Sequence, residues 1–102
     1  MAVRTFSGTA IGGGTASVPV RTGGYQSWVV QQISTSAPSA PIGSTCKIRR
    51  NGVIVVPFMV PTGDVASGEP PIDLSPVDQI TVDWTGLVAG SAVEVTIIYE
   101  VA

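Results

Sequence analysis

The stretch from Ile80 to Val101 reads ITVDWTGLVAGSAVEVTIIYEV, and its alternation of residue types decides the fold class. Apolar side chains occupy every second position of Ile80–Trp84 and again of Val93–Val101, with mostly polar residues between them. A period of two is typical of β-strands that bury one face and expose the other. We therefore expect two strands here, joined as a hairpin through Gly86–Ser91.

The rest of the chain also favours short strands over helices. Twelve glycines and eight prolines interrupt nearly every helix-length window, and Val, Ile and Thr dominate the remaining runs. Further strands are expected at Val3–Ala10, Ser17–Val20 and Tyr25–Ser34, with loops at Ser36–Gly43 and Thr62–Pro71. Seven or eight short strands predict an all-β fold, a small antiparallel β-sandwich of jelly-roll or immunoglobulin-like type.

A length of 102 residues allows one domain, residues 1–102. Gly12–Gly14 interrupt its N-terminal region, so we expect residues 1–24 to act as an arm that orders on docking. Within Tyr25–Ser34, strict alternation places Trp28, Val30 and Gln32 on one face and Val29 and Ile33 on the other.

Asn51-Gly52 is the strongest local signal, because Asn-Gly between two apolar runs is typical of a two-residue type I′ turn. Such a turn fixes the register of the flanking strands: Arg50 opposite Val53, Arg49 opposite Ile54, Ile48 opposite Val55, Lys47 opposite Val56 and Cys46 opposite Pro57. Opposite residues share a side of the sheet. One side, with Cys46, Ile48, Val53 and Val55, is the expected core.

The other side of this hairpin is the candidate interface. It would hold Lys47 and Arg49 beside Ile54, Val56 and Phe58, which is too apolar for a simply solvated face. Either the protein's own loops or a partner would cover it.

Charge is divided along the chain. All five cations lie in the first 50 residues, and all seven anions lie after them. This division is either chance or a self-complementary surface through which copies associate as a homo-oligomer. The net charge of −2 and a pI near 4.7 argue against nucleic acid as a partner.

The composition excludes several kinds of chemistry. The chain has no His and one Cys, Cys46, which leaves no His-based triad, no His-ligated metal and no internal disulfide. The carboxylates of Asp64, Glu69 and Asp73 match no known calcium-loop pattern. We expect no enzyme activity, cofactor or metal. No apolar run approaches the roughly 20 residues of a membrane span, and the first ten residues do not read as a signal peptide.

Aromatic residues leave one alternative open. Trp84 and Tyr99 share faces with apolar neighbours and are expected in the core. Tyr25 and Trp28 are less clearly buried. They are a candidate stacking platform for a glycan.

Residues 44–100 resemble small virion proteins encoded in the structural modules of tailed bacteriophages, most closely those that infect actinobacteria. The resemblance rests on Val53–Val60 followed by PTGDVASGEPPIDLSPVDQITVDWTGLVAGSAVEVTIIYE. Related sequences often carry Gly-Asp where this chain has Val77-Asp78. The resemblance implies a compact β-sandwich assembled in the host cytoplasm onto the major capsid protein or other virion proteins, and it carries over no site residues.

We therefore expect a non-enzymatic virion structural protein that decorates and stabilises the capsid through protein contacts. The alternatives are a minor tail protein and a carbohydrate-binding or host-adhesion module.

Overall fold

The computed structural model describes residues 2–102, apart from the side chains of residues 68–71. Its strands are β1 (Ala2–Thr9), β2 (Ala16–Val20), β3 (Trp28–Ser36), β4 (Thr45–Arg50), β5 (Val53–Met59), β6 (Gly63–Leu74), β7 (Ile80–Thr85) and β8 (Ala92–Val101). Among the described residues there is no helix, and so none that could cross a membrane. The prediction of an all-β sandwich of seven or eight strands is confirmed.

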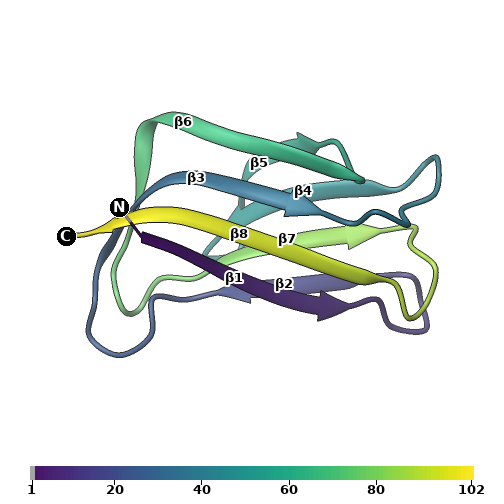
Figure 1. Cartoon of the computed structure of the whole chain (residues 1–102), viewed down its shortest axis with the longest axis horizontal. Coiled ribbons are helices and arrows are strands. Elements are labelled where there is room, and N and C mark those ends of the chain that lie inside the picture. Colours follow the sequence, from purple (N-terminus) through teal and green to yellow (C-terminus); the bar gives the residue numbers. More distant parts are fainter. Residues whose placement is uncertain (1) are drawn as a thin grey trace.

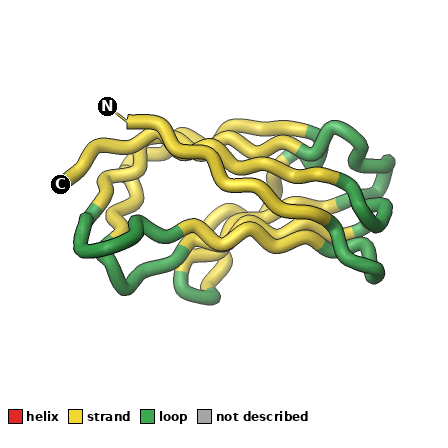
Figure 2. The backbone as a smooth tube through the Cα atoms, turned by 60° about the horizontal axis from the view of Figure 1, so that its bottom comes forward, coloured by secondary structure: helices red, strands yellow, loops and turns green. Residues whose placement is uncertain are grey.

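The strands form two antiparallel four-stranded sheets that pack face to face (Figures 1 and 2). Sheet A has the order β1-β8-β3-β6, and sheet B has the order β2-β7-β4-β5. Eight strands in these two orders are the topology of a jelly roll. Of the two sandwich types expected from the sequence, the strand order is therefore the jelly-roll one.

The jelly roll is a single long ribbon rolled up around its midpoint. The Asn51-Gly52 turn lies at the centre of the 102-residue chain. Besides the pairing of β3 with β8 and of β4 with β7, the strands before the turn pair with the strands after it in reverse order. These pairs are β4 with β5, β3 with β6, β2 with β7, and β1 with β8. Only β4 and β5 are consecutive strands of one sheet, and every other connection crosses to the opposite sheet.

One consequence corrects the prediction for the last third of the chain. The strands at Ile80–Thr85 and Ala92–Val101 form as expected, but they do not form a hairpin. β7 belongs to sheet B and β8 to sheet A, so Gly86–Ser91 is an arch between the sheets. The period of two shows which face of a strand is buried. It does not show which sheet the strand joins, because both sheets bury one face in the same core.

The core lies between the sheets and is built from the alternate apolar residues of each strand. Trp28, Ile48, Ile80, Trp84 and Ile97 are among its fully buried side chains. Trp28 stacks on Tyr99 with ring centroids 3.9 Å apart, and the Trp84 Nε1–H donates to the Pro61 carbonyl at 3.2 Å. Burial of Trp84 and Tyr99, expected from the sequence, is confirmed.

A bulge in β3 changes which residues face the core. The register with β8 shifts between Val30 and Gln32, so that Gln31 is an extra residue. Ile33 therefore joins Trp28 and Val30 in the core instead of facing away from them. The predicted alternation through this strand is wrong beyond Val30, because strict alternation assumes an unbroken ladder.

The N-terminal region is part of both sheets and not an arm. Ala2–Thr9 pairs with β8 along its whole length, and Ala16–Val20 pairs with β7. Gly14 fits closely against the next loop: its φ is 79°, and a Cβ there would lie 2.6 Å from the Leu87 carbonyl oxygen. Of the three glycines expected to give flexibility here, Gly14 permits a close approach of two backbones instead.

Proline marks the edges of the sheets. The strand prolines are Pro19 in β2, Pro57 in β5, and Pro70 and Pro71 in β6, and all three strands are edge strands. An edge position tolerates proline because its missing N–H need not pair. The predicted loop at Thr62–Pro71 is therefore mostly an edge strand.

Candidate interaction surface

The β4–β5 hairpin has the predicted turn. Asn51 and Gly52 have φ values of 51° and 81°, as a type I′ turn requires. The Asn51 side chain also ties the turn to the β6–β7 loop, since its Nδ2 donates to Asp78 and its Oδ1 accepts from the Gln79 N–H, both at 2.9 Å. The turn is thus held by backbone geometry and by side-chain hydrogen bonds.

Beyond the turn, β5 departs from the predicted register. Arg50 lies opposite Val53 and Arg49 opposite Ile54, as expected, but Ile48 then pairs with Val56 and Cys46 with Met59. Two irregularities in β5 cause these shifts. They turn Val56 toward the core, where it packs half-buried, in place of Val55, which is exposed. Val53 keeps the predicted register beside the turn and is exposed as well. The predicted core face of β5 is therefore wrong.

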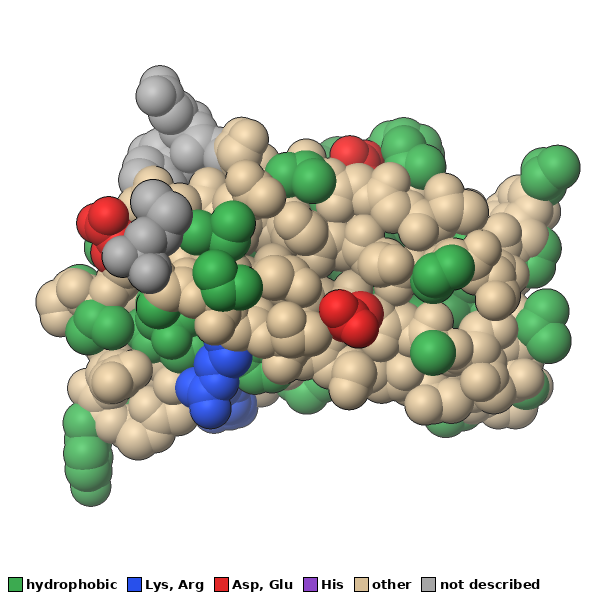
Figure 3. Space-filling view, in the orientation of Figure 1, with side chains coloured by type: hydrophobic (Ala, Val, Ile, Leu, Met, Phe, Trp, Pro, Cys, Tyr) green, Lys and Arg blue, Asp and Glu red, His purple; other side chains and the backbone are tan. Residues whose placement is uncertain are grey.

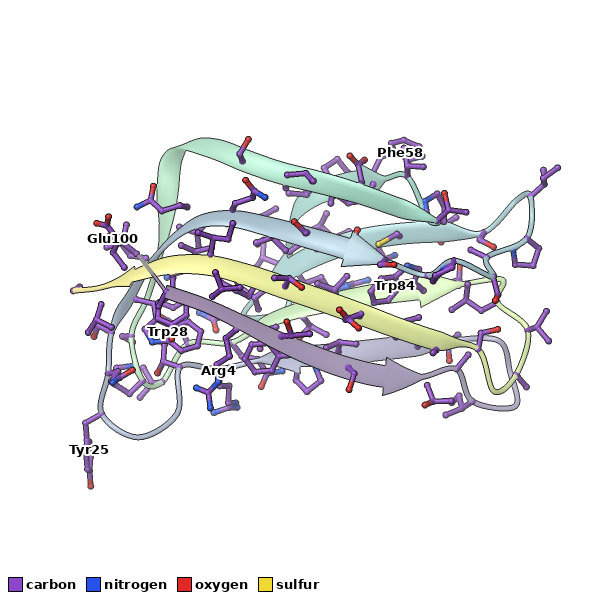
Figure 4. All side chains as sticks on the ribbon, viewed as in Figure 1. Arg4, Tyr25, Trp28, Phe58, Trp84 and Glu100 are labelled. Atoms are coloured by element: carbon purple, nitrogen blue, oxygen red, sulfur yellow. The ribbon has the colours of Figure 1, made fainter. Side chains whose placement is uncertain are left out.

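The result is an apolar surface along the side of the sandwich where β5 and β6 lie, which we call the β5–β6 edge: Val55, Phe58 and Val65. Phe58 is 68% exposed, Val65 52% and Val55 43%. Figure 4 shows Phe58 pointing away from the body of the molecule above β5. Here the sheets part to leave a groove of about 450 Å³, lined by β3, β5 and β6.

The groove walls are mainly apolar. Val30, Ile33, Val55, Ala66 and Ile72 contribute side chains to it, and Gln31, Gln32 and Ser67 are its uncharged polar members. Asp64 lies at one end, where the backbone N–H groups of Val60 and Val65 each donate to its carboxylate at 2.8 Å. These hydrogen bonds hold the pKa of Asp64 below its ordinary value, so the end of the groove stays negative at neutral pH.

The predicted basic members of the interface lie on a different surface. Lys47 and Arg49 are on the outer face of sheet B, where both lie near Asp83. Arg49 Nε donates to the Asp83 carboxylate at 3.0 Å, and Ser17 donates to the same carboxylate at 2.7 Å. Of the five predicted interface residues, Phe58 is therefore on the β5–β6 edge and Val56 faces the core beneath it. Ile54 lies opposite Arg49 and shares the outer face of sheet B with Lys47 and Arg49.

On the opposite side of the sandwich, a charged side chain of an edge strand lies over two aromatic rings. Arg4 on edge strand β1 donates to the Thr22 carbonyl at 3.4 Å, and its guanidinium carbon lies 5.8 Å from the ring centroids of both Phe6 and Trp28. Figure 4 shows this side chain next to Trp28. An inward-facing charge on an edge strand discourages pairing with another chain.

The two candidate glycan-binding aromatics do not form one platform. Tyr25 is fully exposed at the tip of the β2–β3 loop, whereas Trp28 is 0% exposed and stacked beneath β8 (Figure 4). A buried indole presents no face to a sugar, so the prediction that includes Trp28 is wrong.

No group of three His, Cys, Asp or Glu side chains comes together within the part of the chain that the structure describes, and the Glu69 side chain lies outside that part. Cys46 is buried and unpaired, as expected, and burial raises the pKa of its thiol to about 12. A thiol this far from ionisation is a poor nucleophile.

Comparison with known proteins extends the fold and not the function. No protein-family model and no curated protein matches the chain. A crystal structure of FLHE aligns with 95% of this chain and 96% of its own, with a TM-score of 0.53 and 13% identity. The likeness to FLHE shows the fold alone. A crystal structure of dimeric latent PorU from Porphyromonas gingivalis aligns with 93% of this chain and 10% of its own, with 17% identity. Its TM-score of 0.27 supports no inference.

Two residues of the edge were missed by reasoning from the sequence. Val55 was assigned to the core because the register was extended past a bulge, and Val65 was placed in a loop. Pro57 was the available signal, since proline inside a strand marks an edge or a bulge. No comparable signal separates β6 from a loop, because Gly, Pro and acidic residues dominate its sequence.

Proposed function

We propose that the protein is a non-enzymatic structural component of a tailed-bacteriophage virion, in the first instance a capsid decoration protein. It binds neighbouring protein through the β5–β6 edge. The observation that carries the binding role is the exposed apolar side chains of Phe58, Val55 and Val65 around a mainly apolar groove.

The virion setting rests on the resemblance of residues 44–100 to small phage virion proteins. The jelly-roll topology is consistent with it, because this fold occurs in viral capsid proteins, although it also occurs in lectins and cupins. The outward face of sheet A is also consistent with a structural role. Figure 3 shows this face covered mainly by uncharged polar side chains and backbone, with few charged groups.

The proposal is tested by counting copies of the protein in purified virions by quantitative mass spectrometry, with the major capsid protein as the internal standard. A ratio that is a simple fraction of the capsid protein supports decoration of the shell. A few to a few dozen copies per particle would contradict decoration and support the minor tail alternative. Complete absence from virions would overturn the virion proposal.

A further inference from the structure

The two long sides of the sandwich differ in how they treat their edge strands. On the β1–β2 side, the Arg4 guanidinium carbon lies 5.8 Å from the ring centroids of Phe6 and Trp28. On the β5–β6 side, the described residues around the groove are mostly apolar, with Phe58, Val55 and Val65 exposed and Asp64 as the charged member among them. A cluster of exposed apolar side chains beside a groove indicates that a partner covers this side.

The β5–β6 edge carries both a projection and a recess of suitable size. Phe58 projects, and the groove of about 450 Å³ lies beside it. An apolar cavity of about 150 Å³ already accommodates a benzene ring. The groove can therefore receive a phenylalanine side chain together with part of the strand that carries it.

Backbone pairing at this edge is disfavoured. β5 contains Pro57 and two register irregularities, and β6 contains Pro70 and Pro71. Prolines and bulges interrupt the row of N–H and C=O groups that an added strand would need. The contact is therefore made by side chains, which the projection and the groove supply.

We infer that a second copy of this chain covers the β5–β6 edge, related by a twofold axis that places Phe58 of each copy in the groove of the other. In an interface of this symmetry the same patch must complement itself, and a patch that holds both projection and recess does so. The inference rests on the proposed function only in taking this edge as the binding surface.

The dimensions of the molecule fit this arrangement. The side that carries β5 and β6 measures 38 by 23 Å. A stable interface buries about 800 Å² on each partner, which is close to the extent of that side. The ends of the sandwich, at 25 by 23 Å, are smaller than this.

The positions of Phe58 and Asp64 along the β5–β6 edge also fit a twofold arrangement. β5 runs from Val53 to Met59, and Phe58 lies toward the end where Asp64 begins the groove. A twofold axis across the middle reverses one copy, so each Phe58 meets the end of the groove near Val55 and Ile72. The same reversal keeps the two Asp64 carboxylates at opposite ends of the interface, where they do not repel each other.

The test is sedimentation equilibrium of the purified chain, compared with three single variants. Phe58→Ser removes the projection, and Ser67→Trp fills the groove from an exposed position while leaving Phe58 in place. Tyr25→Ser is the matched control, because it removes a fully exposed aromatic side chain far from the edge. Far-UV circular dichroism checks that each variant is folded.

We expect a dimer for the wild type and for Tyr25→Ser, and a dimer dissociation constant raised at least about thirtyfold in Phe58→Ser and Ser67→Trp. A monomeric wild type, a trimer, or folded Phe58→Ser that dimerises as well as the wild type would each overturn the inference. Because the experiment uses the purified chain alone, its outcome is independent of the copy count in virions. A failed dimer test would leave the virion proposal untouched, and a failed copy count would leave the dimer inference untouched.

Discussion

Asp78 accepts hydrogen bonds from two consecutive residues at the start of the β4–β5 turn, Arg50 and Asn51, and from its own loop. Asn51 donates to it at 2.9 Å, the Arg50 guanidinium at 3.2 Å and the Ser75 N–H at 2.9 Å. These donors, with Asn51 and Ser75 foremost, lower the pKa of Asp78 to about 2. The side chain therefore links the middle of the ribbon to the connection between β6 and β7 in its ionised form.

This predicts a pH dependence that belongs to one residue. The pKa is lower in the folded chain than the ordinary value of 3.8, so Asp78 stabilises the fold above about pH 4 and loses this effect as the pH falls toward 2. Asp78→Asn should unfold at lower urea concentration than the wild type at pH 7 and approach it near pH 2. Glu94→Gln, an exposed change on β8, is the control. If the difference in urea midpoint between Asp78→Asn and the wild type were the same at every pH, the pH dependence would not come from Asp78.

Cys46 makes a second prediction at the scale of one residue. Because the thiol is buried and its pKa is raised to about 12, a thiol reagent at pH 8 should react only when the chain unfolds. The labelling rate should then rise with urea in parallel with the unfolded fraction. Fast labelling of the native protein would show that the strands around Cys46 open locally.

At the scale of elements, the strands were predictable and their irregularities were not. Alternating apolar residues identified β7 and β8, and Asn51-Gly52 identified the turn and its first two pairs. Gln31 and the residues of β5 after Ile54 insert into their ladders, and each insertion reverses which side chains face the core. A bulge is defined relative to the partner strand, which is the distant β8 for Gln31 and the adjacent β4 for β5, so the pattern within one strand does not reveal it.

The turn itself gives the next prediction. Gly52 has a φ of 81°, so Gly52→Ala places a Cβ in the left-handed region and should cost roughly 1–2 kcal/mol of unfolding free energy, measured by urea titration. Gly12→Ala is the matched control, since Gly12 has no positive φ and its added Cβ meets nothing within 4 Å. An equally small effect of both substitutions would mean that the turn does not constrain the hairpin.

At the scale of the whole molecule, rolling a ribbon about its midpoint brings the first half of the chain against the second. This places two cations of the first half beside anions of the second, since Arg49 pairs with Asp83 and Arg50 with Asp78. Each is a partly exposed ion pair that contributes modestly to stability. The division of charge was visible in the sequence, but its meaning needed the strand order, which alternation within strands does not specify.

The rolled ribbon also leaves two unequal sides, one guarded by Arg4 and one exposing the β5–β6 edge. The account as a whole depends on the second of these being the surface through which the protein joins its neighbours. When copies of the protein are linked through this edge, each copy helps to hold the others on the particle. Loss of the contact at the edge therefore weakens the attachment of every copy.

The most direct measurement is therefore the binding of purified protein to particles assembled without it, followed by co-sedimentation. The account predicts that wild type and Tyr25→Ser bind equally and that Phe58→Ser binds at least about tenfold more weakly while remaining folded. Binding of folded Phe58→Ser at the wild-type level would contradict the claim that the β5–β6 edge is the interaction surface.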